Sequence, residues 1–193
     1  MEKNKSPAQN KVQVTPPVLV AICGLAGSGK TTCAEFLEQE WGYTNIKFAG
    51  PIKEMLRALG LNDNHLEGGL KEIPTALLAG HSPRHAMQTL GTEWGREQMG
   101  QEFWVDIWRQ SAAKIIGEGG RVVVDDCRFP NELRAVRYLG GQAITIQRPV
   151  ERKPVLPHRS ETTPSNTDCV VMNDSGRAHL LQQLCKTLRL DCQ

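Results

Sequence analysis

The chain has 193 residues, a formal net charge of +2, 39% hydrophobic residues and 23% charged residues. This length is typical of one domain with a buried core, and the ordinary content of charged residues argues against global disorder. The three lysines and Glu2 of segment 1–16 together give the whole net charge of +2. The rest of the chain is therefore neutral, which argues against a protein that binds nucleic acid or a membrane surface.

The polar segment 1–16 has no apolar stretch of the kind found in secretory signals, and we expect a flexible arm there. Residues 17–193 are expected to form a single domain. No apolar run in the chain reaches the ~18 residues of a membrane helix. The six cysteines are scattered without a Cys-x-x-Cys pair, which predicts free thiols in a reducing compartment and hence a cytoplasmic protein.

The first half of this domain alternates between strand and helix patterns. Residues 18–23 are a short apolar run, typical of a strand that is buried on both faces. Residues 31–41 have the apolar spacing of a helix, residues 45–48 have the pattern of a second strand, and residues 52–59 have that of a second helix. The glycine-rich segment 61–83 predicts no clear element.

The second half continues this alternation. Residues 84–116 have a helical pattern that glycines interrupt, and the polar, proline-rich segment 148–166 predicts a mobile lid. The remaining patterns predict strands at 122–124, 143–146 and 169–172 and helices at 130–139 and 180–188. Strands that alternate with helices predict an α/β fold with a mainly parallel sheet.

The segment from Gly24 to Thr31 fits the pattern Gly-x-x-x-x-Gly-Lys-[Ser/Thr] between a predicted strand and a predicted helix. Glycines let backbone N–H groups approach phosphate oxygens, and the positive end of the helix faces the anion. Lys30 supplies a cation for the β- and γ-phosphates, and the Thr31 hydroxyl can bind Mg²⁺. We therefore expect ATP, or GTP, with Mg²⁺. The expected ATP-binding residues are Gly24, Ala26, Gly27, Ser28, Gly29, Lys30, Thr31 and Thr32, with Arg148 and Arg152 of the lid.

Two carboxylates, Asp125 and Asp126, end the predicted strand at 122–124. The carboxyl end of a strand beside a phosphate loop is where such folds hold Mg²⁺ or its waters. Arg128 follows at once and is expected to point into the same cleft.

Cationic side chains outside the phosphate loop indicate that the second substrate is also an anion. A phosphate monoester is already ionised at neutral pH, because its second pKa is ~6. A kinase that acts on such an acceptor needs no strong base, and its barrier is the repulsion between two polyanions, which Arg and Lys relieve. The candidates for this role are Lys53, Arg84, Arg96, Arg128, Arg148, Arg152 and Arg159.

Five segments, in order along the chain, resemble the bacteriophage deoxynucleoside monophosphate kinase family. They are residues 48–53, 84–93, 103–105, 126–132 and 158–161, and they follow the phosphate loop. The resemblance implies a nucleoside-monophosphate-kinase-like, three-layer P-loop fold with a mobile lid. It also implies transfer of the γ-phosphoryl group of ATP to a deoxynucleoside 5'-monophosphate (dNMP), which yields the diphosphate.

The resemblance also implies roles for single residues. The acceptor region is about 48–108, and the lid is about 148–166. Lys30, Asp126 and Arg128 are the expected catalytic residues, and Mg²⁺ is expected on Thr31 and, through water, on Asp126. The dNMP is expected to contact Lys53 and Arg84 through its phosphate, Gly91 and Thr92 along its pocket, and Trp104 through its base, with Asp126, Arg128 and Glu132 between the two substrates. His158, Ser160 and Glu161 match a lid motif to which we assign no role.

Two other functions fit parts of these patterns. A kinase for another phosphorylated small molecule, similar to animal phosphomevalonate kinase, would share the phosphate loop and the Asp-x-Arg motif but would give a base-stacking Trp104 no task. A nucleotide-dependent switch or assembly ATPase would need a guanine-reading Asn-Lys-x-Asp motif or an extended interaction surface, and the sequence indicates neither. We therefore expect small-molecule nucleotides as partners, with no nucleic acid and no membrane, and we leave the base preference and a homodimer open.

Overall fold

The computed structural model describes residues 15–149, 164 and 166–191. Most of the predicted arm and lid, including Arg152, His158, Arg159, Ser160 and Glu161, therefore lie outside the described residues. In the part that the structure describes, no helix is long and apolar enough to cross a membrane.

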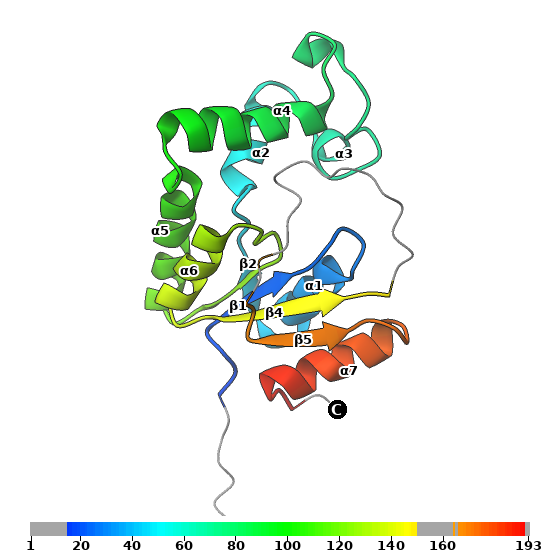
Figure 1. Ribbon diagram of the computed structural model, residues 1–193, viewed down its shortest axis with the longest axis vertical. Coiled ribbons are helices and arrows are strands. Elements are labelled where there is room, and N and C mark those ends of the chain that lie inside the picture. Colours follow the sequence, from blue (N-terminus) through cyan, green and yellow to red (C-terminus); the bar gives the residue numbers. More distant parts are fainter. Residues whose placement is uncertain (1–14, 150–163, 165, 192–193) are drawn as a thin grey trace, which may run out of the picture.

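A parallel five-stranded sheet with the order β2-β3-β1-β4-β5 forms the centre of the molecule, as Figure 1 shows. The strands are β1 (Leu19–Cys23), β2 (Tyr43–Asn45), β3 (Arg121–Val124), β4 (Gln142–Gln147) and β5 (Cys169–Met172). In the central strand, Ala21 is in register with Val124 of β3 and with Ala143 of β4. The prediction of an α/β fold with a parallel sheet is confirmed.

Helices cover both faces of this sheet and give the fold its three layers (Figure 1). On one face, α1 (Lys30–Trp41) and α7 (Arg177–Leu188) pack on Val20 and Ile22 of β1. On the other, α5 (Phe103–Gly117) and α6 (Pro130–Tyr138) pack on Leu19 and Ala21. Successive side chains of a strand point to opposite faces, so the fully buried run of β1 supplies both cores.

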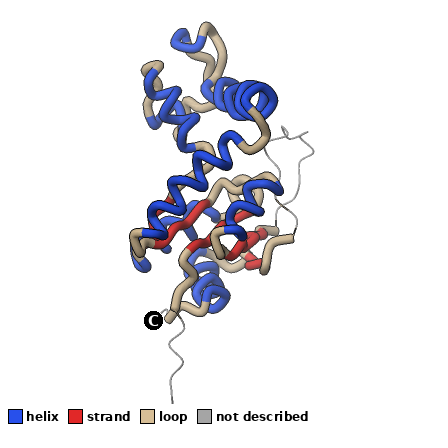
Figure 2. The backbone as a smooth tube through the Cα atoms, turned by 90° about the vertical axis from the view of Figure 1, so that its left-hand side faces the viewer, coloured by secondary structure: helices blue, strands red, loops and turns tan. Residues whose placement is uncertain are grey.

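A separate group of short helices, here called the helical lobe (residues 48–104), leaves the sheet after β2. It contains α2 (Gly50–Ala58), α3 (Asp63–Leu66), a 3₁₀ turn (Ala76–Leu78), α4 (Pro83–Thr89) and the π-helix η2 (Leu90–Met99). The lobe has a core of its own, which Ile52, Leu56, Leu61, Leu66 and Trp104 form. Figure 2 shows these helices stacked beyond the sheet.

The structure differs from the predicted elements at three places. The second strand lies at Tyr43–Asn45 rather than at 45–48, because residues 48 and 49 turn their N–H groups to Asp126 instead of to a neighbouring strand. The segment 61–83 contains two short helical elements. Gly91 and Gly95 continue the helical run after residue 84, and only Gly100, with φ 126°, ends it.

The prediction of free thiols holds for Cys23, Cys33, Cys127 and Cys169. It is wrong for Cys185 of α7, which is disulfide-bonded. Sequence spacing could not show this, because a disulfide requires two cysteines whose Cα atoms lie within about 7 Å, and the fold alone decides that distance.

Candidate active site

The loop between β1 and α1 has the backbone shape of a phosphate cradle. Gly24 and Gly29 have φ of 140° and 109°, values that favour glycine over residues with a Cβ. A Cβ at Gly24 would lie 2.4 Å from the Ile146 carbonyl oxygen. Gly29 immediately precedes α1, whose positive end therefore faces the loop. Lys30 Nζ donates to the Leu25 carbonyl at 2.8 Å, across the loop.

A cavity of about 400 Å³ opens beside this loop. Asn173, at the carboxyl end of β5, donates from Nδ2 to the Ser28 carbonyl at 2.8 Å and so joins the far strand to the loop. The structure brings the predicted residues Thr32 and Arg148 to this cavity, and it adds Asn173 and Arg177, which the sequence analysis missed. Both residues follow the last predicted strand of a parallel sheet, and this position could have marked them in the sequence as candidates for the site. The cavity is lined by Gly27, Gly29, Lys30, Thr31, Thr32, Arg148, Asn173, Gly176, Arg177 and Leu180.

Asp125 lies closest to the phosphate loop among the two carboxylates after β3. The Thr31 hydroxyl donates to Asp125 Oδ2 at 3.3 Å, and Lys47 Nζ is 3.2 Å from Oδ1. Burial alone would lower the pKa of Lys47, but the Asp125 carboxylate outweighs it and raises that pKa. A buried carboxylate beside a threonine hydroxyl is an oxygen donor set that suits Mg²⁺.

Asp126 has a different place from the one predicted. Its two carboxylate oxygens accept hydrogen bonds from the N–H groups of Phe48 and Ala49, each at 2.9 Å, and so fasten the start of the helical lobe to the sheet. Burial raises the pKa of Asp126, although these two bonds oppose the shift. The carboxylate next to Thr31 belongs to Asp125, because neighbouring side chains after a strand diverge. The water-mediated contact of Asp126 with Mg²⁺ stays a prediction.

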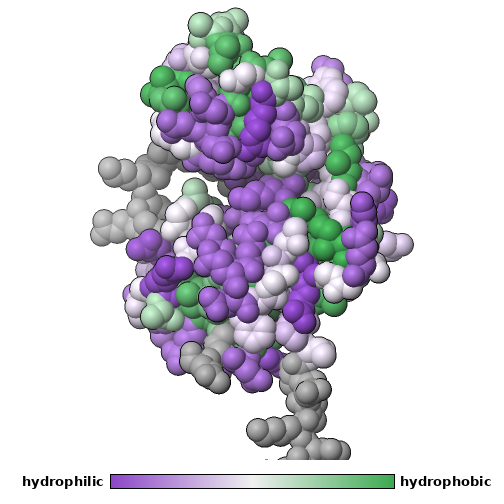
Figure 3. Space-filling view, turned by 180° about the vertical axis from the view of Figure 1, so that it is seen from behind, coloured by the Kyte–Doolittle hydropathy of each residue, from purple (hydrophilic) through white to green (hydrophobic). Residues whose placement is uncertain are grey.

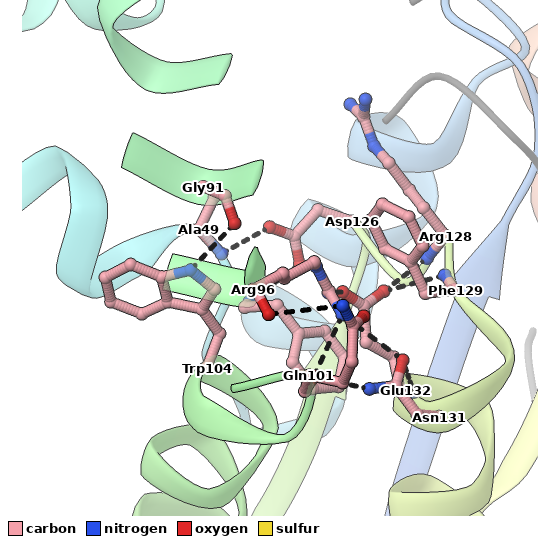
Figure 4. A network of polar contacts seen from close by, with 11 residues as sticks. Ala49, Gly91, Arg96, Gln101, Trp104, Asp126, Arg128, Phe129, Asn131 and Glu132 are labelled. Carbon is pink, nitrogen blue, oxygen red and sulfur yellow. Dashed lines mark hydrogen bonds and ion pairs between the residues drawn. The ribbon is translucent and has the colours of Figure 1, made fainter. Parts of the chain in front are cut away.

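Glu132 is buried within a polar network (Figure 4), and its place between the two substrates stays a prediction. Its Oε1 accepts from Arg96 Nη2 at 2.5 Å, and its Oε2 accepts from the N–H groups of Arg128 and Phe129 at 2.6 and 3.0 Å. Burial raises the pKa of Glu132 to about 7 against these three donors. Figure 4 shows that the Arg128 guanidinium points away from this network, so Glu132 holds the backbone from which Arg128 projects.

Trp104 lies in the core of the helical lobe and is only 3% exposed. Its indole N–H donates to the Gly91 carbonyl at 3.0 Å, and a Cβ at Gly95 would lie 2.0 Å from its Nε1 (Figure 4). Thr92 is also buried. Trp104 therefore packs η2 against α5, and its contact with a nucleotide base stays a prediction.

The predicted acceptor cations, Lys53 and Arg84, each hold a carboxylate of the lobe. Lys53 Nζ pairs with Glu67, and Arg84 Nε donates to Glu72 Oε1 at 2.7 Å. Neither carboxylate, nor the neighbouring Lys71, was singled out in the sequence analysis, because segment 61–83 showed no motif.

These cations share one electrostatic site with the phosphate loop. Burial and the Arg128 charge lower the pKa of Lys30. Burial and the charges of Arg84, Lys53 and Arg128 lower the pKa of Lys71. Arg128 is therefore the common neighbour of the loop and of the lobe. Figure 3 shows hydrophilic side chains gathered at the waist between lobe and sheet.

The family model for deoxynucleotide monophosphate kinases matches residues 67–184, which is more than half of the chain. The chain belongs to this family. The matched part of the kinase runs from the helical lobe to α7 and contains Lys71, Arg84, Arg128 and Asn173.

Curated relatives agree with this membership. The kinase is 31% identical, over 144 residues, to a protein of Acanthamoeba polyphaga mimivirus named for deoxynucleotide monophosphate kinase activity; the alignment covers 68% of this chain and 75% of that relative. It is 37% identical, over 76 residues, to the deoxynucleoside-5'-monophosphate kinase of Escherichia phage T5, with 37% of this chain and 30% of the phage protein covered.

A solved structure supports the fold. A sugar kinase from Janibacter sp. HTCC2649 is similar with a TM-score of 0.50 at 14% identity, over 91% of this chain and 96% of that one. At this identity the similarity concerns the P-loop kinase fold alone.

Proposed function

We propose that this kinase transfers the γ-phosphoryl group of ATP to the phosphate of a deoxynucleoside 5'-monophosphate and releases ADP and the deoxynucleoside diphosphate. The observation that carries the proposal is the meeting of two cationic sites at Arg128. One is the phosphate loop with Lys30, and the other is the lobe with Lys53 and Arg84. Family membership identifies the acceptor class, and both curated relatives carry the name of this activity.

The reaction brings two polyanions together, and the cationic residues of this chain reduce the repulsion between them. In transfer, an acceptor phosphate oxygen forms a bond to the γ-phosphorus while the bond to the β,γ-bridging oxygen breaks. The acceptor oxygen is already ionised at neutral pH, so no base has to remove a proton. Lys30 faces the donor phosphates, Lys53 and Arg84 face the acceptor phosphate, and Arg128 lies between them, where negative charge spreads in the transition state.

ATP and Mg²⁺ are part of the proposal. The cavity beside the phosphate loop, with Arg148 and Arg177 on its wall, suits the nucleoside of the donor. Thr31 and Asp125 would hold Mg²⁺, directly or through water, and the ion would neutralise charge on the β- and γ-phosphates. Lys47 Nζ, 3.2 Å from Asp125 Oδ1, would hold that carboxylate in position.

The test is turnover of the purified chain with ATP and Mg²⁺ against each of dTMP, dGMP, dCMP and dAMP. We expect ADP and the matching diphosphate with at least one of them, detected by a coupled assay and by chromatography of the products. ADP that forms at the same rate without any acceptor would identify an ATPase, and no turnover with any of the four acceptors would refute the proposal.

Arg84→Ala is expected to raise the KM for the dNMP by about tenfold, with a smaller loss of kcat, because a charged hydrogen-bonding partner of the acceptor phosphate is lost. The backbone bond from Arg84 N–H to the Lys71 carbonyl, 2.9 Å long, does not depend on the side chain, so the lobe keeps its shape. Steady-state kinetics with varied dNMP measures the effect. Arg109→Ala, which removes an exposed guanidinium from α5, is the control, and equal parameters for both variants would remove Arg84 from the acceptor site.

Asp125→Asn is expected to raise the Mg²⁺ concentration for half-maximal rate and to lower kcat by about 10²-fold, since the neutral amide no longer supports the ion. A titration of rate against Mg²⁺ at fixed ATP measures both effects. Asp106→Asn changes an exposed carboxylate on α5 in the same way and should leave the titration unchanged. A normal dependence of the rate on Mg²⁺ in Asp125→Asn would show that Asp125 does not bind the ion and that another residue does.

A further inference from the structure

The two cations proposed to bind the acceptor phosphate, Lys53 and Arg84, each form an ion pair with a carboxylate of the protein. Glu67 pairs with Lys53, and Glu72 accepts from Arg84 Nε at 2.7 Å. The two carboxylates come from one short segment, 67–72, which follows α3, whereas the cations come from α2 and α4. The cations are more enclosed than their partners: side-chain exposure is 10% for Lys53 against 47% for Glu67. The anions are thus the outer, replaceable members of each pair.

Lys71 lies between the two carboxylates in the sequence and has no anion of its own. Within residues 15–149, 164 and 166–191, its half-buried ammonium makes neither a hydrogen bond nor an ion pair. Its carbonyl accepts from Arg84 N–H at 2.9 Å, which fixes the segment against the start of α4. Burial and the charges of Arg84, Lys53 and Arg128 lower the pKa of Lys71, against the opposing charge of Glu67.

Among the described residues, Lys71 adds a positive charge beside two ion pairs, Lys53 with Glu67 and Arg84 with Glu72, and no carboxylate in that part of the chain pairs with Lys71. The Arg128 charge acts on Lys71 from the sheet side and has the same sign. Like charges crowded in a partly buried site repel one another unless an anion joins them. A phosphate monoester carries close to two negative charges and several acceptor oxygens at neutral pH, so it can satisfy cations that a single carboxylate cannot.

We propose that Lys71 is a further acceptor-binding residue, and that Glu67 and Glu72 are exchangeable counter-ions that hold Lys53 and Arg84 until the phosphate of the dNMP takes their place. The proposal rests on the proposed function, and it names the residues that receive the acceptor phosphate. The two carboxylates are exposed, at 47% for Glu67 and 63% for Glu72, so each can return to water while the phosphate supplies the enclosed cation with a new anion. The exchange would also link acceptor binding to movement of segment 67–72.

The first test is Lys71→Ala, compared with Lys71→Arg and with Lys114→Ala, which removes an exposed lysine of α5. We expect Lys71→Ala to raise the KM for the dNMP by about tenfold while the KM for ATP stays within twofold, and Lys71→Arg to restore most of the affinity. Calorimetric titration with dNMP in the absence of ATP should show the same loss. A normal acceptor KM and a normal titration in Lys71→Ala would overturn the assignment of Lys71.

The second test is Glu67→Gln, alone and combined with Lys53→Gln. Because the glutamine no longer competes for Lys53, we expect Glu67→Gln to lower the KM for the dNMP by about two- to fivefold. Glu54→Gln changes an exposed carboxylate of α2 in the same lobe and controls for the change in overall charge. In the Lys53→Gln background the benefit of Glu67→Gln should disappear, because the pair that it releases is already broken.

A higher KM in Glu67→Gln would show that Glu67 positions Lys53 and would overturn the exchange. An equal decrease of the KM for the dNMP in Glu67→Gln and Glu54→Gln would also overturn the exchange, because the effect would then come from the overall charge of the lobe. A decrease that persists when Glu67→Gln is combined with Lys53→Gln would overturn it for the same reason. These outcomes all require a wild-type enzyme that turns over a dNMP. An inactive wild type would instead refute the proposed function, so the two failures remain distinct.

Discussion

Lys30→Ala is expected to lower kcat for phosphoryl transfer to a dNMP by about 10³-fold. Lys30 projects from the first turn of α1 across the phosphate loop, where its ammonium reaches the Leu25 carbonyl at 2.8 Å. Alanine preserves the glycine turns and the helix. It removes the cation that neutralises the negative charge developing on the leaving ADP. The loss should therefore be in kcat at saturating ATP and dNMP, measured by coupled detection of ADP.

The folded state should tolerate this change. Burial and the neighbouring Arg128 charge lower the pKa of Lys30, which means that the ammonium is held in the loop at an electrostatic cost and does not stabilise the fold. Thermal unfolding of Lys30→Ala should match that of wild type, and Lys114→Ala supplies the same loss of charge on an exposed face of α5. An unchanged kcat in Lys30→Ala, with a normal melting curve, would remove the phosphate loop from the chemistry.

Arg128→Ala is expected to lower kcat by about 10²-fold or more, with a smaller change in either KM. Its side chain projects between the phosphate loop and the lobe. Its charge accordingly lowers the pKa of Lys30 in the loop and of Lys71 in the lobe. A cation at that point gains most when negative charge spreads between donor and acceptor. The anchor of the segment survives the substitution, because Glu132 accepts from the Arg128 backbone N–H at 2.6 Å and not from its guanidinium.

Single-turnover kinetics separates this effect from slow product release. The rate of the chemical step should fall in Arg128→Ala and stay normal in Arg109→Ala, whose guanidinium is exposed on α5. A raised acceptor KM with a normal rate of transfer would make Arg128 a binding residue only.

The parts of this molecule that the sequence predicted depend on local patterns. The buried run of β1, the glycines of the phosphate loop and the apolar spacing of α1 lie within a continuous stretch of chain. Each has a short-range physical cause: burial on both faces, backbone freedom at glycine, and a helical period. For this reason the strand–loop–helix unit and the parallel α/β class were predictable from residues alone.

The side-chain contacts that the sequence did not predict involve partners that lie far along the chain. Nothing in the pair Asp125–Asp126 tells which carboxylate faces Thr31 and which accepts from the backbone of residues 48 and 49. Trp104 has the same composition signal whether it stacks on a base or packs, and the close approach of Gly95 decides for packing. Lys71 belongs to no sequence motif, and its role becomes evident only from the charges of Arg84 and Lys53 that act on it in the folded chain.

By itself, the sequence determined that this protein binds nucleotide phosphates in a P-loop fold and that its other substrate is an anion, because the glycine-rich loop and the excess of loop cations act through residue type and short spacing. The tertiary structure alone decided which of those charges meet. It places Asp125 beside Thr31, turns Asp126 and Glu132 into anchors of backbone, and sets Glu67 and Glu72 on the acceptor cations. Exposed charges are largely screened from one another beyond about 8 to 10 Å at physiological salt, so charge pairing depends on contacts that only the folded chain creates.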